Sequence, residues 1–476
     1  MRPLRSSRTF RAFPLLAGAA LLSLSACGAD DGTTSLDSVE VIDSASDATG
    51  GATTDTATDT ATATATALTT GSTAADATWD ETTEVLITLS GDRADASNDT
   101  ADAVDIDGTT VEIEAPGTYR ITGTLADGNI EIDAEVDGLV RVVLDGVDIA
   151  SSTTAPLSIS KATDTVIVLA DGSTNVLTDP ASYVYPDAAT DEPNAALFAD
   201  DPLTITGSGS LEVNADFGDA IAGRDTVLID GGTITVHAVD DGIRGNDALQ
   251  ITGGTITVDA GGDGLKSDTS LTVAGGTIDV QQSYEGLEAP AITIAGGTVS
   301  VVSSDDGINA ASDSGTPTLT ITGGDVTVHA DGDGLDVNGS ITMTGGTVVV
   351  DGPTENMNGA IDYDQTFEIS GGVIVATGSS GMAMAPSSDS AQLSLLATFG
   401  TQAAGTTVSV VASDGAVIAS VTPTKQFSSI AVSTPDVSAD DTYSIVVDGQ
   451  VLGTTTTADA AGQDGPGGRG GGPRQP

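Results

Sequence analysis

A glycine pair recurs at a nearly constant interval through the second half of this chain. The pairs stand at residues 231–232, 253–254, 275–276, 296–297, 323–324, 345–346 and 371–372. Successive pairs begin 22, 22, 21, 27, 22 and 26 residues apart, and the alternating runs "TITVHA" and "TITVDA" follow the first two. A repeat of this length is typical of a solenoid, in which each unit buries its apolar side against its neighbours.

The length and pattern of the repeat favour a parallel β-helix. At about 3.3 Å per strand residue, one repeat gives a perimeter on the order of 70 Å. That perimeter fits three short strands per coil, around "LQI", "TITV" and "DGL". We therefore expect an all-β fold in which Ile256 points inward and stacks on Ile234 of the preceding coil, while Thr255 points outward. The longest interval contains "ASDSGTPT", which we interpret as an insertion into one turn.

An acidic residue followed by a small residue marks a second position in the repeat. These acids are Asp219, Asp241, Asp263, Glu285, Asp306 and Asp333, and the uncharged pair Asn358-Gly359 closes the series. Stacking in register would place neighbouring carboxylates about 4.8 Å apart, where they repel by roughly 3–4 kcal/mol at an effective dielectric constant of about 20. A hard divalent cation with oxygen ligands relieves such repulsion, so we predict calcium at one or more of these six acids. Asp240 and Asp305 are candidate additional ligands. The alternative is that Asp-Gly serves here only as turn chemistry.

A third position lies two residues after the small residue of each pair. It carries Arg244, Lys266, Glu288, Asn309, Asp336 and Ile361 in successive repeats. Arg244 and Lys266 have three open interpretations: neutralisation of neighbouring acids, recognition of sugar hydroxyls or uronate carboxylates, or, for Lys266, action as the general base of a lyase assisted by calcium. Tyr284 either stacks on a sugar face or packs in its loop. The candidate carbohydrate-binding residues are Arg244, Lys266, Tyr284 and Glu288.

Composition narrows the choice of partners. The formal net charge is −55 with only 14 Lys and Arg, which excludes nucleic acid as an expected partner because phosphates would be repelled. Aromatic residues make up 3% of the chain, so a core built on Phe and Trp is not expected. Cys27 is the only cysteine, which excludes intramolecular disulfides and cysteine-based metal sites. We expect a monomer.

The first residues are typical of an export signal. Four arginines within the first eleven residues precede the apolar run Phe13–Leu24, and "LSACG" follows. This segment resembles a bacterial lipobox, which implies cleavage before Cys27, lipidation of its sulfur and anchoring to the outside of the bacterial cell membrane. The alternative is an ordinary signal peptide with a chance cysteine. The expected layout is a signal peptide over 1–26, a disordered tether over 27–78, a β-rich N-terminal part of the solenoid over 79–200, β-helix repeats over 201–386, a β cap over 387–456 and a disordered tail over 457–476.

The repeats resemble a family of bacterial carbohydrate-binding domain-containing surface proteins. The similar stretches are "GTYRITGTLADGNIEID", "VRVVLDGVDIASSTTAPLSI", "ALFADDPLTITGSGSLEV", "DDGIRG", "GGTITVDAGGDGLKSD", "DGDGLDVNGS" and "GGVIVATGSSGMAMAPSS", between Glu84 and Val451. The resemblance implies a calcium-binding, right-handed parallel β-helix akin to polysaccharide lyases, which binds acidic or plant-type polysaccharides without established catalysis. Arg244, Glu288 and the neutral Asn358 depart from the pattern of the other repeats.

Three functional hypotheses follow from these observations. The first is a lipid-anchored protein that binds polysaccharide on a calcium-loaded β-helix without catalysis. The second is a calcium-dependent polysaccharide lyase with Lys266 as its base. The third is a structural adhesin or spacer without sugar specificity.

Overall fold

The computed structural model describes residues 78–99, 101, 103–187, 189–312 and 314–460. The expected signal peptide, the lipidation site Cys27, nearly all of the expected tether and the tail after residue 460 lie outside these described residues. Within the described residues, no helix has the length and apolar character needed to cross a membrane. Thr457–Ala460, which we expected to belong to the tail, form the short helix α1.

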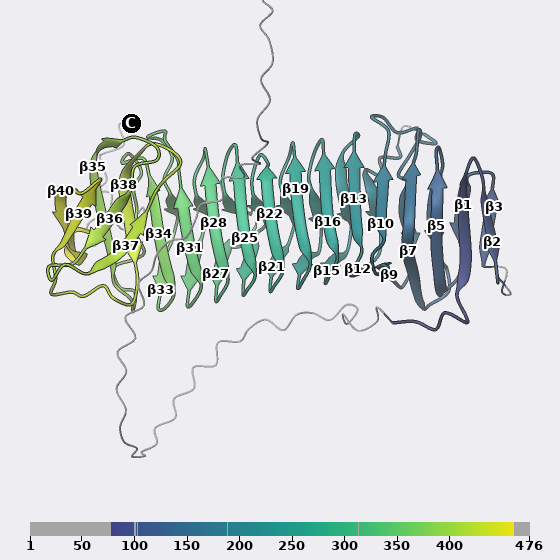
Figure 1. The fold of residues 1–476 in the computed structure, drawn as a ribbon, viewed down its shortest axis with the longest axis horizontal. Coiled ribbons are helices and arrows are strands. Elements are labelled where there is room, and N and C mark those ends of the chain that lie inside the picture. Colours follow the sequence, from purple (N-terminus) through teal and green to yellow (C-terminus); the bar gives the residue numbers. More distant parts are fainter. Residues whose placement is uncertain (1–77, 100, 102, 188, 313, 461–476) are drawn as a thin grey trace, which may run out of the picture. The chain divides into compact units, whose positions relative to one another are not determined.

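The fold is a parallel β-helix whose coils contribute strands to three ladders (Figure 1). The first ladder holds the "TITV" strands: β10 (Thr174–Thr178), β13 (Ser210–Ala215), β16 (Thr233–Ala238), β19 (Thr255–Ala260), β22 (Thr277–Gln282), β25 (Thr298–Ser303), β28 (Asp325–Ala330), β31 (Thr347–Asp351) and β34 (Val373–Gly378). The second ladder holds the "LQI" strands: β9 (Asp164–Leu169), β12 (Leu203–Gly207), β15 (Thr226–Ile229), β18 (Ala248–Ile251), β21 (Ser270–Val273), β24 (Ala291–Ile294), β27 (Thr318–Ile321), β30 (Ser340–Met343) and β33 (Phe367–Ile369).

The third ladder holds the "DGL" strands and carries the candidate site. Its strands are β4 (Thr110–Ile113), β6 (Asn129–Asp133), β8 (Leu157–Lys161), β11 (Ala195–Ala199), β14 (Asp219–Gly223), β17 (Ile243–Gly245), β20 (Leu265–Lys266), β23 (Leu287–Glu288), β26 (Ile308–Ala310), β29 (Leu335–Val337) and β32 (Ile361–Tyr363). The prediction of three strands per coil is therefore confirmed. The first two ladders merge at the long strand β7 (Leu139–Ala150), which pairs with β9 through its first half and with β10 through its second.

The core is a set of apolar stacks that run from coil to coil. Ile234 pairs in register with Ile256, which pairs with Ile278, and all three are fully buried. Thr255 stacks outward on Thr233, as the alternating pattern predicts. The second glycine of each pair has a positive φ, for example 87° at Gly254, which side chains rarely adopt. The glycine pairs thus form the turns that lead into the first ladder.

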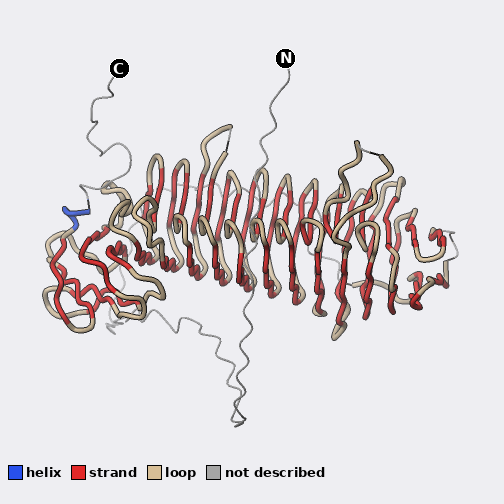
Figure 2. Tube along the Cα trace, turned by 90° about the horizontal axis from the view of Figure 1, so that it is seen from above, coloured by secondary structure: helices blue, strands red, loops and turns tan. Residues whose placement is uncertain are grey.

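Both ends of the β-helix are covered by antiparallel strands. At the N-terminal end, β2 (Ala94–Ser97) pairs with β1 (Val85–Gly91), which pairs in parallel with β5 (Gly117–Leu125), and β3 (Val104–Asp107) pairs with β4. At the other end, β38 (Phe427–Ser433) pairs antiparallel with both β34 and β35 (Ser394–Gln402). A separate four-stranded sheet follows, seen at the yellow-green end of Figure 1 and in Figure 2: β36 (Val408–Val411), β37 (Val417–Val421), β39 (Tyr443–Val447) and β40 (Gln450–Thr455). Such covers prevent further strands from adding to the open ladders.

Candidate carboxylate and carbohydrate site

Two columns of polar residues run along the third ladder. The turn column precedes the ladder strands and consists of Asp219, Asp241, Asp263, Glu285, Asp306 and Asp333. The strand column lies three residues later in each coil and is defined by the strand register as Ala222, Arg244, Lys266, Glu288, Asn309, Asp336 and Asp362. The six predicted calcium-binding acids make up the first column, and the candidate additional ligands Asp240 and Asp305 each precede one of its members by one residue. Three of the four predicted carbohydrate-binding residues are consecutive in the second column.

The acids of the turn column bond to the backbone of the next coil. Asp219 Oδ1 accepts a hydrogen bond from the N–H of Asp241 at 3.1 Å, and Asp241 Oδ1 accepts one from the N–H of Asp263 at 2.9 Å. The same bond joins Asp263 to Glu285 and Asp306 to Asp333. Glu285 differs, since its longer side chain reaches the strand column and accepts a hydrogen bond from Asn309 Nδ2 at 2.8 Å. One oxygen of each aspartate therefore has a structural role, which the turn interpretation did not anticipate.

The last turn corrects the sequence-based register. We expected Asn358 to close the turn column and Ile361 to follow Asp336, but the N–H of Gly359 donates to Asp333 and Asp362 pairs with Asp336. The register is fixed by the core, because Ile361 is buried and pairs with Leu335. A shift by one residue would turn that isoleucine outward and an aspartate inward.

Acidic residues in and beside the two columns form three clusters. In each cluster, one oxygen from every member lies within 4.8 Å of one from each other member. The clusters are Asp219, Asp240 and Asp241 (cluster 1), Asp263, Glu285 and Glu288 (cluster 2), and Asp306, Asp333 and Asp336 (cluster 3). The six predicted acids are all members, whereas the sequence did not identify Glu288 and Asp336 as partners of the turn column. The sequence feature that could have identified Glu288 and Asp336 is their constant spacing of three residues from the acids of the turn column. This spacing places the two side chains of a coil on the same edge when a strand begins at the turn.

Burial disfavours the ionised form of several of these carboxylates. Burial, reinforced by neighbouring acids, raises the pKa of Asp219, Glu285 and Asp333 to about 7 each, and the pKa of Asp336 to about 8. Asp219 is 2% exposed, and its Oδ2 has no hydrogen-bond partner among the described residues. Clustered carboxylate oxygens of this kind fit a hard divalent cation such as calcium.

Lys266 distinguishes cluster 2 from the other two clusters. Its ammonium donates hydrogen bonds to Asp263 and to Glu288, the latter at 2.7 Å, and lies 3.7 Å from Asp241 Oδ2. Burial alone would lower the pKa of Lys266, but the hydrogen bonds to Asp263 and Glu288 outweigh it and raise the pKa. An ammonium held in this way favours charge neutralisation over action as a general base.

Arg244 and Tyr284 lie on either side of this lysine along the chain. Arg244 Nη2 donates to both carboxylate oxygens of Asp268, at 3.1 and 3.0 Å, whereas Arg244 Nε is buried without a partner among the described residues. The Tyr284 side chain is 50% exposed, and a hydrogen bond with Asp305 raises the pKa of its hydroxyl to about 12. Tyr284 thus has an accessible ring, as stacking on a sugar requires.

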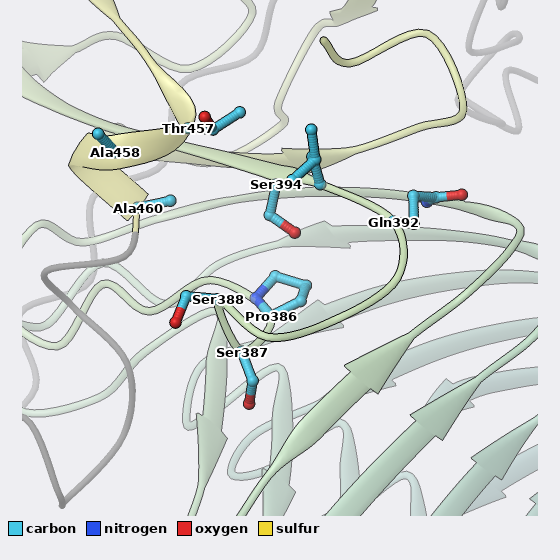
Figure 3. Close-up of a pocket in the computed structure, with 9 residues that line it drawn as sticks. Pro386, Ser387, Ser388, Gln392, Ser394, Thr457, Ala458 and Ala460 are labelled. Carbon is cyan, nitrogen blue, oxygen red and sulfur yellow. The ribbon is translucent and has the colours of Figure 1, made fainter. Parts of the chain in front are cut away.

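A separate cavity of about 220 Å³ lies between α1 and residues 386–394 (Figure 3). Its polar lining residues are Ser387, Ser388, Gln392, Ser394 and Thr457, and none of the lining residues is an acid or a base. It therefore adds nothing to the charged site.

Comparison with known proteins places clusters 1 and 2, but not cluster 3, within a known family pattern. Residues 107–290 match the family model of the carbohydrate-binding domain-containing proteins. A carbohydrate-binding domain-containing protein of Acetivibrio thermocellus is 39% identical over 152 residues, which are 32% of this chain and 52% of that relative. The chain thus spans about half the length of the curated relative that it matches. The resemblance expected from the sequence is confirmed over 107–290, and the motifs "DGDGLDVNGS" and "GGVIVATGSSGMAMAPSS" lie beyond this match.

Among solved structures, a gadolinium derivative of the polysaccharide lyase-like protein from C. thermocellum is similar to this chain. The two share 31% sequence identity with a TM-score of 0.45, over 55% of this chain and 96% of that one.

Proposed function

We propose that this protein binds polysaccharide along the third ladder without cleaving it. The observation that carries the proposal is the family match over residues 107–290, which contains clusters 1 and 2 together with Arg244, Lys266, Tyr284 and Glu288. A solenoid offers the same polar positions on successive coils, an arrangement suited to a polymer that repeats along its own length.

We further propose that calcium binds at the carboxylate clusters. Clusters 1 and 3 would hold it through the oxygens of Asp219, Asp240 and Asp241, and of Asp306, Asp333 and Asp336. In cluster 2, the ammonium of Lys266 already neutralises the acids. Bound calcium would replace protons on the buried carboxylates and lower the repulsion between this acidic protein and a uronate-containing glycan.

The second candidate function is a polysaccharide lyase with Lys266 as its base. Lys266 is half-buried beside the proposed sugar-binding residues, which is where a base would have to stand. Its raised pKa argues against that role, because a base must be largely unprotonated at the working pH. We therefore favour binding without catalysis.

One experiment separates these functions. The domain over residues 78–460 would be run through gels that contain polygalacturonate, a neutral β-glucan or a xylan, with and without chelator, while unsaturated product is followed by ultraviolet absorbance. Retention that weakens on chelation and yields no product supports calcium-dependent binding. Product that disappears in Lys266→Ala supports the lyase. Neither signal on any polymer would leave the spacer as the explanation.

We also propose that the mature chain is a monomer, exported and anchored through lipidated Cys27. The support for export and anchoring is the sequence of residues 1–28, with its arginines, apolar run and "LSACG". Cell fractionation tests the anchor, since Cys27→Ser should release the protein from the membrane fraction. Equal membrane association of both forms would overturn it.

A further inference from the structure

A small cavity lies on the outer face of the third ladder beside the first acid of the turn column. Its volume is about 80 Å³, and its lining includes Glu192, Asn194, Phe198, Asp219 and Arg244. We call it the Asn194 cavity. These residues come from the segment before β11 and from β11, β14 and β17, so three successive coils build it.

Three polar atoms among these lining residues are buried without a hydrogen-bond partner in the described part of the chain. They are Asn194 Oδ1, Asp219 Oδ2 and Arg244 Nε. The rest of each charged group is held in place, because Asp219 Oδ1 binds the N–H of Asp241 and Arg244 Nη2 binds Asp268. Native proteins rarely leave several buried polar groups unpaired at one place. Two acceptors and one donor, fixed in position, therefore indicate a ligand that both donates and accepts hydrogen bonds.

The cavity also has an apolar wall. Phe198 is 4% exposed and pairs in register with Ala222, with which it forms a buried cluster separate from the main core. Leu197 and Ala199, its neighbours on β11, belong to the main core. The Phe198 ring therefore lies on the outer side of the strand. An aromatic wall beside hydrogen-bonding groups suits a ring that carries both C–H and hydroxyl groups.

Both guanidinium groups around the cavity are already paired with carboxylates. Arg224 Nε donates to Glu192 Oε1 at 2.6 Å and lies 3.3 Å from Asp200 Oδ1, while Arg244 is paired with Asp268. Neither guanidinium is left for a carboxylate on the ligand. The cavity thus favours a neutral group, and the hydroxyl edge of a sugar fits better than its carboxylate.

Two tyrosines hold the segment that carries Asn194. Tyr185 donates to the carbonyl of Pro193 at 2.8 Å, and Tyr183 donates to the carbonyl of Ala195 at 3.0 Å. Tyr183 is stacked on Phe217, with ring centroids 4.3 Å apart. The backbone on both sides of Asn194 is therefore fixed before any ligand arrives, which lowers the entropic cost of binding.

We propose that the Asn194 cavity binds the vicinal hydroxyl edge of one pyranose residue. Hydroxyl hydrogens donate to Asn194 Oδ1 and to one lone pair of Asp219 Oδ2, whose other lone pair stays available to a cation in cluster 1. A hydroxyl oxygen accepts from Arg244 Nε, and the ring lies against Phe198. A second cavity of about 280 Å³ also contains Glu192 and Phe198, and it extends to Ser158 on β8. The neighbouring sugar residues of a glycan continue into it across the coils. This assignment rests on the proposed polysaccharide function and gives it a location.

Two measurements test the cavity, both in saturating calcium so that the carboxylate clusters keep one state. The first is the affinity for whichever gel polymer retains the native domain. Asn194→Leu keeps the size of the side chain but removes its acceptor, and Arg244→Lys keeps the charge but removes Nε. Each should weaken retention about tenfold, as loss of a buried hydrogen bond predicts. Asn214→Leu, a matched change on β13 outside the cavity, should leave retention and melting temperature as in the native domain.

The second measurement is nuclear magnetic resonance of the domain with ¹⁵N-labelled asparagine side chains, titrated with methyl β-glucopyranoside. The Asn194 side-chain amide should shift saturably, and the Asn214 amide should not. Retention of a polymer without a shift of Asn194, or with native affinity in both variants, overturns the cavity and leaves the proposed function standing. A shift of Asn194 without retention on any polymer supports the cavity and overturns polysaccharide binding. Failure of both measurements overturns both proposals.

Discussion

At the scale of single residues, Lys266 occupies the space among carboxylates that a metal ion would take. Its ammonium contacts Asp263 and Glu288, two members of cluster 2. We predict that Lys266→Met binds one more calcium ion than the native domain, because the carboxylates of cluster 2, of which Asp263 is buried and Glu285 and Glu288 are partly buried, then lack a counterion. Without calcium, the variant should melt at a lower temperature. Isothermal titration calorimetry gives the stoichiometry, with Lys161→Met as the control, since Lys161 forms only an exposed ion pair with Glu135. Equal stoichiometry in Lys266→Met and the native domain would contradict the prediction.

The buried acids also make the stability of the folded domain depend on pH. Asp219, Glu285 and Asp333 have pKa values near 7 in the folded chain, against ordinary values of 3.8 for Asp and 4.5 for Glu. The folded state therefore binds more protons than the unfolded state between about pH 4 and pH 7, and Asp336, with a pKa of about 8, extends this range to about pH 8. The stability of the chelated domain falls as pH rises through this range and levels off above it.

Thermal melts in chelator at pH 5, 6, 7 and 8 check this expectation. Calcium should flatten the decline, because the cation replaces the proton. Asp333→Asn should also reduce it, since an amide oxygen can still accept the hydrogen bond from Gly359 but cannot ionise. A melting temperature that rises with pH in chelator would show that the acids are not destabilised by ionisation.

At the scale of elements, the features that were predicted correctly from the sequence are those that recur in successive coils. The inward stack through Ile234, Ile256 and Ile278 follows from a period of two within strands and about 22 between coils. The turn column follows from the same period. The register at Asp362 was missed because its coil has an irregular length, and only burial of Ile361 fixes it.

Contacts between repeating and non-repeating segments could not be predicted from the sequence. The Asn194 cavity combines β14 and β17 with an irregular segment before β11, and no period predicts where that segment packs. Neutralisation of neighbouring acids was one of the three interpretations of Lys266, but the sequence could not identify its three carboxylate partners, because they depend on which rotamer a long side chain adopts between coils.

Asp351, at the end of β31, links the β-helix to the C-terminal cap through hydrogen bonds. It accepts hydrogen bonds from the N–H of Thr424 at 2.7 Å and from its hydroxyl, and it contacts His329 at 3.2 Å. Burial would raise the pKa of Asp351, but the bonds from His329 and Thr424 outweigh it and lower the pKa. The stabilisation is therefore complete above about pH 4 and is lost as pH falls through the lowered value.

Asp351→Ala should weaken the docking of the cap by roughly 1–3 kcal/mol, because buried donors lose their acceptor. Hydrogen exchange should then accelerate in β38 and β35, while β16 to β28 stay protected. Asp440→Ala, which changes an exposed acid of the cap, is the matched control. Native exchange in β38 of Asp351→Ala would show that strand pairing alone holds the cap.

At the scale of the whole molecule, each carboxylate cluster links two successive coils, and successive coils are also the ones that pair through their strands. Cluster 1 joins the coils of Asp219 and Asp241, and cluster 3 joins those of Asp306 and Asp333. The N-terminal coils, from β4 to β11, contain no such cluster among their described residues. In a solenoid, stability is close to a sum of coil and interface contributions, so loss of a cation acts locally.

Removal of calcium should therefore loosen one part of the β-helix more than another. We predict that chelation accelerates hydrogen exchange in the third-ladder strands β14, β17, β26 and β29, while β6 and β8 exchange as before and serve as the internal control. Asp219→Asn combined with Asp333→Asn should reproduce the effect in the presence of calcium, because amides keep the backbone hydrogen bonds but bind the cation weakly. Equal acceleration along all coils would mean that the cation acts on the cooperative unfolding of the whole solenoid. If chelation changed no exchange rate, calcium would not contribute to the stability of the β-helix. The carboxylates with raised pKa values would then be stabilised by keeping their protons at neutral pH.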